Sequence, residues 1–164
     1  MRKITKEASQ AFKDEMQRDN RENYLPLPNG QEKIVYSNNN TQVIIYWTEA
    51  NYEGKDKHTI LKLHGNTIVH HVQNVFCFEP SPHKQFDINL CGWATNTTRE
   101  RLNGLLETLG FDFRIKQLKG EQIAHGKKYG SSIKRSYTLD EDTNQNVFLI
   151  NSIITGKNIS QLTS

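Results

Sequence analysis

Basic side chains concentrate in one stretch of the chain, and their charge could bind an anionic partner. Between Thr97 and Leu139 stand nine lysines and arginines against four acidic residues, a local charge of +5. Clustered positive charge attracts nucleic acids, nucleotides and acidic protein surfaces. An ordinary solvated face is the alternative interpretation, and the charge count alone does not separate the two.

Two of these arginines occupy an unusual position. Arg99 and Arg101 fall in the first turn of a predicted helix, where cations oppose the helix dipole. Together with the N–H groups of that turn, two guanidinium groups could hold an anion, unless both simply pair with neighbouring carboxylates. For Arg101 and for Asn103 the sequence suggests no structural task. The predicted recognition surface consists of Arg99, Arg101, Asn103, Arg114, Lys116, Lys127, Lys128, Lys134 and Arg135.

Five histidines gather in the middle of the chain, near Cys77 and Cys91. Zinc sites use ligand pairs at short spacing, such as two cysteines separated by two residues, and this sequence has none. His70 and His71 would point to opposite faces of a strand, with His70 toward the core. We therefore predict no metal and no cofactor. Two cysteines make no disulfide framework and suggest reduced thiols.

Motifs for catalysis are absent from the sequence. It contains no nucleophile elbow, no phosphate-binding glycine loop and no metalloprotease motif. Cys91, His71 and Asp87 could meet in space, but no spacing selects that arrangement. Binding is favoured over catalysis, and the question of an enzyme stays open.

Composition limits the class of protein. The chain has 164 residues, a mass of 19.0 kDa and a net charge of +3, which suits one domain over residues 1–164. Mean hydropathy is −0.74, and no apolar run approaches the roughly 18 residues of a membrane span. The first residues lack the apolar segment of a secretory signal. We expect a soluble protein that does not contact a membrane.

The elements that must position these residues can be outlined from periodicity. A stripe of apolar residues predicts a helix over 4–18 with Thr5 as its N-cap. Alternating and β-branched runs predict a sheet core over 41–91, with a hairpin that turns at Gly65-Asn66 and pairs Leu63 with Ile68.

Further along, Thr97 and Glu100 have the spacing of a capping box at the start of a helix over 97–109, which Gly110 ends. Strands are expected between 111 and 154, including one over 147–154, and a loose tail over 155–164. The fold class predicted is α+β: an antiparallel sheet of about five to seven strands with two helices packed on it.

Three sequence segments resemble a family of small uncharacterised bacteriophage and prophage proteins. They are Lys3-Ile4-Thr5-Lys6-Glu7-Ala8-Ser9-Gln10-Ala11-Phe12, Leu63-His64-Gly65-Asn66-Thr67-Ile68, and the segment from Gly92-Trp93 to Arg101-Leu102-Asn103. The family brings no established activity or catalytic residue. The resemblance implies a phage accessory protein that acts in the host cytoplasm.

By analogy, phage accessory proteins of this size often block a host defence system by binding it. The leading hypothesis is therefore stoichiometric inhibition of a host antiviral complex, either a protein or a ribonucleoprotein of the CRISPR type. One alternative is direct nucleic-acid binding by the basic region 97–135. Another is binding or cleavage of a nucleotide signal at the helix start near Thr97, Thr98 and Arg99. The oligomeric state is not predicted.

Overall fold

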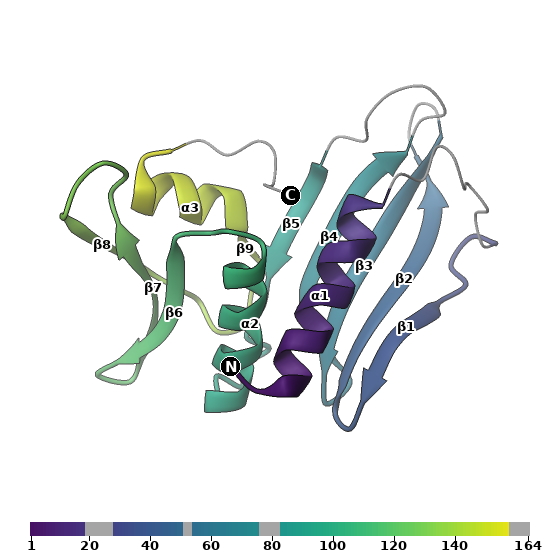
Figure 1. Cartoon of the computed structure of the whole chain (residues 1–164), viewed down its shortest axis with the longest axis horizontal. Helices are drawn as coiled ribbons and strands as arrows, with labels where there is room; N and C mark the ends of the chain where they lie inside the picture. The colour runs from purple at the N-terminus through teal and green to yellow at the C-terminus, as the bar shows by residue number, and fades with distance from the viewer. Residues whose placement is uncertain (19–27, 51–53, 76–82, 158–164) are drawn as a thin grey trace.

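The computed structural model describes residues 1–18, 28–50, 54–75 and 83–157. Within them the chain forms three helices and nine strands, drawn in Figure 1. The α+β prediction is confirmed. In chain order the elements are α1 (Lys3–Gln17), β1 (Lys33–Asn38), β2 (Thr41–Glu49), β3 (Lys55–Leu63), β4 (Asn66–Val75), β5 (His83–Ile88), α2 (Asn96–Thr108), β6 (Phe113–Leu118), β7 (Glu121–Lys127), β8 (Lys134–Thr138), β9 (Gln145–Asn146) and α3 (Val147–Thr155).

The strands form two sheets where one was expected. The larger sheet has the order β1-β2-β3-β4-β5-β9 and the smaller has β6-β7-β8, and every described pairing is antiparallel. Helix α1 packs across the larger sheet, and α2 lies between α1 and β6 (Figure 1). The second sheet places the basic strands β6 to β8 on the far side of α2 from α1.

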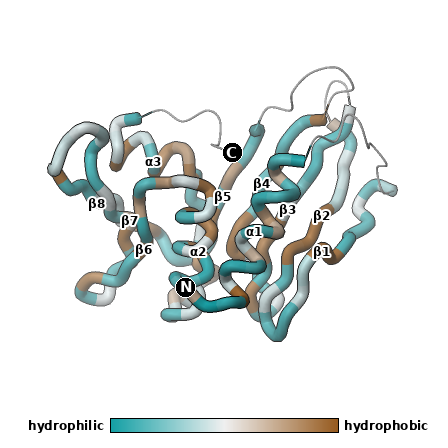
Figure 2. The backbone as a smooth tube through the Cα atoms, in the orientation of Figure 1, coloured by the Kyte–Doolittle hydropathy of each residue, from teal (hydrophilic) through white to brown (hydrophobic). Residues whose placement is uncertain are grey.

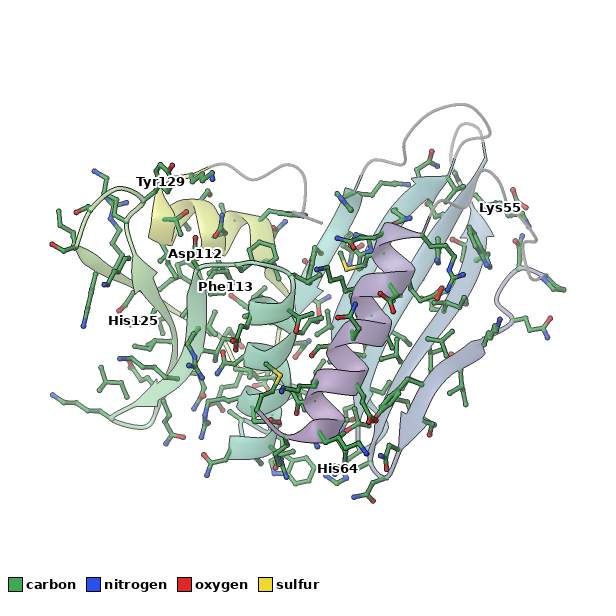
Figure 3. The ribbon with its side chains drawn as sticks, in the orientation of Figure 1. Lys55, His64, Asp112, Phe113, His125 and Tyr129 are labelled. Atoms are coloured by element: carbon green, nitrogen blue, oxygen red, sulfur yellow. The ribbon has the colours of Figure 1, made fainter. Side chains whose placement is uncertain are left out.

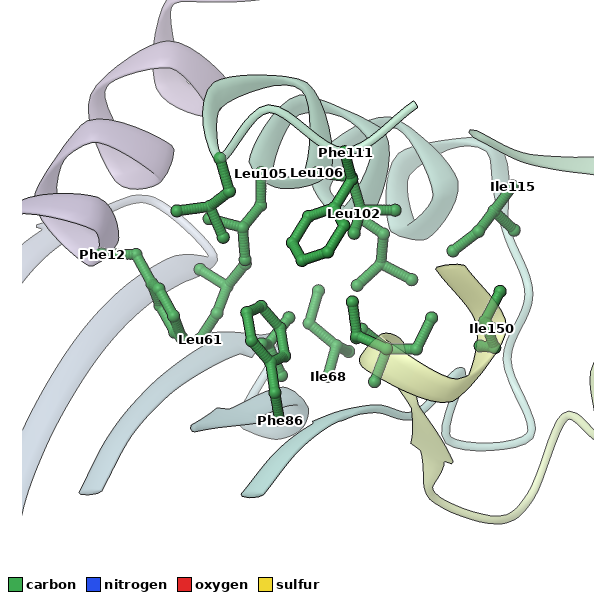
Figure 4. Packing of buried hydrophobic residues seen from close by; sticks show 14 of the residues in the cluster. Phe12, Leu61, Ile68, Phe86, Leu102, Leu105, Leu106, Phe111, Ile115 and Ile150 are labelled. Carbon is green, nitrogen blue, oxygen red and sulfur yellow. The ribbon is translucent and has the colours of Figure 1, made fainter. Parts of the chain in front are cut away.

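One hydrophobic core joins both sheets. Phe86 on β5 is fully buried and lies against Phe12 of α1 and Phe111, which follows α2. Leu102 and Leu106 of α2 are at most 1 % exposed and extend the core toward Ile115 of β6 (Figure 4). Strand β2 contributes a hydrophobic stretch, brown in Figure 2. Because α2 is held on both sides, its N-terminal turn has a fixed position relative to β6.

The β3–β4 hairpin differs from the prediction by one residue. Its turn is His64-Gly65, with φ of 51° and 79°, and Leu63 pairs with Asn66. Two positive φ angles define a type I′ turn, which suits the twist of a hairpin. A bulge follows: Lys62 pairs with Thr67 and Leu61 with Val69, so Ile68 is the extra residue. As a result His71, fully buried, faces the core, and the prediction for His70 was wrong.

Both predicted helix caps were misplaced. Helix α1 begins at Lys3 with Arg2 at its N-cap, and Thr5 lies inside the helix as a fully buried residue. At α2 the N-cap is Thr95, whose hydroxyl accepts a hydrogen bond from the Thr98 backbone N–H at 3.1 Å. The proposed capping box at Thr97 is therefore wrong: Glu100 points instead to Thr5 and Arg101.

Replacing Thr95 by alanine should lower the free energy of unfolding by about 1 kcal/mol, because the Thr98 N–H loses its side-chain acceptor. Replacing Thr97 by alanine removes no such bond, and we expect a change within about 0.5 kcal/mol. Urea titrations of the two variants distinguish the caps. A larger loss for Thr97→Ala than for Thr95→Ala would contradict this assignment.

The apolar run at 147–154 is a helix and not the predicted strand. The Asn146 side chain accepts a hydrogen bond from the Leu149 N–H at 3.0 Å, and Gly156 ends α3 with a φ of 72°. Thr155, predicted to lie in a loose tail, is the last residue of α3 and is 4 % exposed. Residues 158–164 of that tail lie outside the described residues. In the parts of the chain that the structure describes, no helix is long and apolar enough to cross a membrane.

Candidate binding groove

A groove of about 580 Å³ runs between the N-terminal half of α2 and strand β6. These two elements lie side by side in Figure 1. Four cationic side chains line the groove: Arg99, Arg114, Lys116 and Lys119. The groove is shallow and largely open to solvent. Arg99, Arg114 and Lys116 belong to the predicted recognition surface, and the fold brings Arg99 of α2 beside the two cations of β6.

Arg99 is positioned by neutral groups. Its Nη1 donates to the Ala94 carbonyl oxygen at 2.7 Å and to Gln122 Oε1 at 3.0 Å, and its Nη2 donates to the Asn96 side chain. These acceptors fix the guanidinium without cancelling its charge. Since Arg99 carries five N–H donors, such anchoring leaves donors that a ligand could use.

The groove cations have no acidic partners in the described chain. Within residues 1–18, 28–50, 54–75 and 83–157, no ion pair involves Arg99, Arg114, Lys116 or Lys119. The carboxylate of Glu100 lies at the groove but is engaged by Arg101, Arg2 and Thr5. Partial burial raises the pKa of Glu100, but these hydrogen bonds outweigh it and hold the pKa below its ordinary value.

Asn103 has a structural task that sequence reasoning did not find. Its Nδ2 donates to the Ile115 carbonyl oxygen at 2.8 Å, and its Oδ1 accepts from the Ile115 N–H at 2.7 Å. The amide therefore imitates a neighbouring strand and pins β6 to α2. It lines the groove while holding the groove's two walls together.

Arg101 also has a structural task. It is 2 % exposed, and its guanidinium donates to Thr5 of α1, Thr41 of β2 and its neighbour Glu100. The structure therefore places Arg101 inside the fold, where it joins three elements and does not face a partner.

Four cations share the outer face of the smaller sheet. Arg114 and Lys116 of β6 project from the same face as Lys127 of β7 and Lys134 of β8, because directly paired residues share a face. His125 lies among them and is labelled in Figure 3, on the far side of the smaller sheet from α1. Desolvation, followed by the charges of Lys116 and Lys134, lowers the pKa of His125. This face continues the groove through Arg114 and Lys116.

Two further predicted residues are placed elsewhere. Arg135 projects from the opposite face of β8 and donates to the Ile153 carbonyl oxygen of α3 at 3.3 Å. Lys128 lies in the connection after β7. Sequence reasoning omitted Lys119 from the recognition surface. The sequence did indicate the place of Lys119: Lys119-Gly120 is typical of a turn, and in the structure this turn brings Lys119 to the groove.

The histidines form two hydrogen-bonded pairs on opposite faces of the larger sheet. Nδ1 of His58 lies 2.8 Å from Nε2 of His70, and Nε2 of His71 lies 2.8 Å from Nδ1 of His83. Burial lowers the pKa of all four, to about 4 for His58. In the described part of the chain, no group of three or more His, Cys, Asp or Glu residues is arranged to hold a metal.

The possible arrangement of Cys91, His71 and Asp87 does not form. Asp87 pairs with His70 across β4 and β5, whereas His71 pairs with Phe86 on the other face. The thiol of Cys91 contacts the Thr67 carbonyl oxygen at 3.2 Å, and burial raises its pKa. Cys77 lies outside the described residues.

The fold and the groove define a small α+β protein with a cation-lined groove between α2 and β6. Residues 27–154 match the family described as Kyanoviridae Gp96 protein, which is more than half of the chain. The chain belongs to this phage protein family. No curated protein and no solved structure matches the chain.

Proposed function

We propose that this phage protein inhibits a host antiviral defence complex in the host cytoplasm by binding it stoichiometrically. The observation that carries the proposal is the convergence of Arg99, Arg114, Lys116 and Lys119 in one groove without acidic partners in the described chain. Uncompensated charge in a preformed groove favours association with an acidic surface and raises its rate. Membership of a phage family supports an action during infection.

The test combines binding with a phage readout. The tagged protein is expressed in bacteria that carry a defence system, and captured complexes are compared with and without nuclease. We expect a nuclease-resistant complex in a fixed ratio and restored plating of a phage that the defence otherwise blocks. Unrestored plating across the defence systems tested, or capture that nuclease abolishes, would overturn the proposal.

A charge-matched pair of variants locates the surface. Arg114→Glu with Lys116→Glu reverses two groove cations, whereas Lys6→Glu with Lys33→Glu reverses two exposed lysines on α1 and β1. Both variants lower the net charge by the same amount. We expect only the groove variant to lose capture and plating. Equal behaviour of the two would place the binding surface elsewhere.

Nucleic-acid binding is the second candidate, favoured by the row of cations on the outer face of β6 to β8. It predicts a steep fall of affinity for duplex DNA or RNA with salt and a smaller slope when Lys127 and Lys134 are replaced by alanine. Filter binding at several salt concentrations measures this. A nucleotide site at the start of α2 has less support, since the Thr98 hydroxyl already donates to the Trp93 carbonyl oxygen at 3.0 Å.

A further inference from the structure

The edge of β6 that faces the groove is open at one residue. Ile115 directs its N–H and C=O toward α2, where Asn103 engages both. Along an antiparallel strand, alternate residues direct these groups to the same side. Gln117 must therefore direct its N–H and C=O into the groove as well. The two-residue turn at Lys119-Gly120 leads to the same orientation. In such a hairpin Leu118 and Glu121 form the hydrogen-bonded pair next to the turn, so the backbone N–H and C=O of Gln117 point away from β7.

Cations surround this open edge. Gln117 is exposed and lines the groove together with Arg99 and Lys119, while Arg114 and Lys116 stand on the adjoining face. An unpaired strand edge is a ready template for another chain, and charged side chains beside it select what can pair. Here the selection is for negative charge.

Resting on the proposed function, we propose that the groove takes an extended acidic segment of the partner protein, which pairs its backbone with Gln117. The segment's carboxylates contact Arg99, Lys119 and the cations of β6. This is recognition by strand addition, in which backbone hydrogen bonds supply affinity and flanking side chains supply specificity. Asn103 closes the edge at Ile115, so the added strand is short.

Peptide fits this groove better than nucleic acid does. Gln117 offers one donor and one acceptor side by side, which matches a peptide backbone, whereas phosphate oxygens only accept. The residues that line the groove include no aromatic ring on which a base could stack. The flanking amides of Asn96 and Gln117 also donate and accept.

The edge can be tested with one substitution and its control. Gln117→Pro removes the N–H that faces the groove and leaves the hydrogen bonds of β6 to β7 in place, since Gln117 does not use its N–H in that ladder. Gln117→Ala keeps the N–H. The probe is a fluorescent eight-residue peptide of alternating glutamate and valine, and a single-stranded DNA oligonucleotide is the comparison.

We expect the peptide to bind and Gln117→Pro to weaken it roughly fivefold or more, with Gln117→Ala within about twofold of the natural protein. A peptide N-methylated at alternate residues should bind weakly to the unaltered protein, which tests the edge even if the proline variant does not fold. Equal affinities for the proline and alanine variants, or binding of the oligonucleotide without the peptide, would overturn the inference.

The outcome separates this inference from the proposed function. If Gln117→Pro keeps the host complex and the restored plating while Arg114→Glu with Lys116→Glu loses both, strand addition is wrong and inhibition stands. If the peptide binds in the predicted way while plating is never restored, the acidic-peptide site stands and the inhibitor function falls.

Discussion

Replacement of Arg101 by alanine is expected to lower the free energy of unfolding by about 3–5 kcal/mol, since it breaks a buried charged network. The guanidinium is 2 % exposed and donates to Thr41 Oγ1 at 3.1 Å and Thr5 Oγ1 at 2.7 Å, besides contacting Glu100. Without it, the Glu100 carboxylate loses its buried cation and keeps only the exposed Arg2, at 3.8 Å, within a network that joins α1, α2 and β2. We expect the loss to appear as a lower urea midpoint.

Arg114→Ala is the control for Arg101→Ala, because Arg114 is exposed and lies in the groove. Its free energy of unfolding should stay within about 0.5 kcal/mol of that of the unaltered protein. A similar small change for Arg101→Ala would mean that Arg101 does not hold the helices to the sheet. The pair also separates folding from binding, since only Arg114 is expected to contribute to the groove.

Acidification from pH 7 to pH 5 is expected to lower the free energy of unfolding by about 2 kcal/mol or more. Burial, reinforced by the charges of His83 and Lys57, holds the pKa of His71 well below its ordinary value. Burial also lowers the pKa of His58 to about 4, reinforced by the charge of His70. In the unfolded chain both titrate near 6.5, so the unfolded state binds more protons below that pH. Stability is therefore complete above about pH 6.5 and falls as the pH approaches the folded pKa values.

Urea midpoints between pH 7 and pH 5 measure this effect before most carboxylates titrate. The His125→Gln variant is the comparison, because His125 is only partly buried and should contribute much less to the profile than the fully buried His71. A single histidine contributes at most about 1.4 kcal/mol per pH unit, so a steeper fall requires several. A flat profile over this range would show that the buried histidines are not neutral in the folded protein.

Local signals in the sequence located most helices and strands, but long-range packing decided several details. The stripe of apolar residues that predicts α1 is visible in the sequence, although Glu15 interrupts it. Glu15 is buried because Lys57 of β3, 1 % exposed, lies 3.2 Å from its Oε1. No local pattern could pair residues 42 positions apart. At 147–154, by contrast, the sequence did contain local signals for a helix, because Asn146 and Gly156 are typical cap residues. The apolar, β-branched run between them favoured a strand instead, and the prediction was wrong.

The sequence predicted the positive charge of the candidate groove, but it did not show which of the polar side chains hold the fold together. Counting cations found Arg99, Arg114 and Lys116, because positive charge is visible without a fold. Arg101 and Asn103 look equally available in the sequence. Only the packing of α2 between two sheets shows that one is buried and the other holds the Ile115 backbone. Residue type alone does not distinguish a side chain that holds the fold together from one that is free to contact a partner.

The pairing of β5 with β9 has a consequence for the order in which the chain can fold during synthesis. β9 comes from residues 145–146, and its partners Asp87 and Ile88 are translated more than fifty residues earlier. Until residues 145–146 have been synthesised, the β5 edge of the larger sheet has no neighbouring strand. During that interval the ribosome synthesises α2 and the entire smaller sheet. Charged residues on β5, such as Lys84 and Asp87, discourage pairing with other nascent chains during that interval. The larger sheet is therefore completed late, after the groove it supports has already been translated.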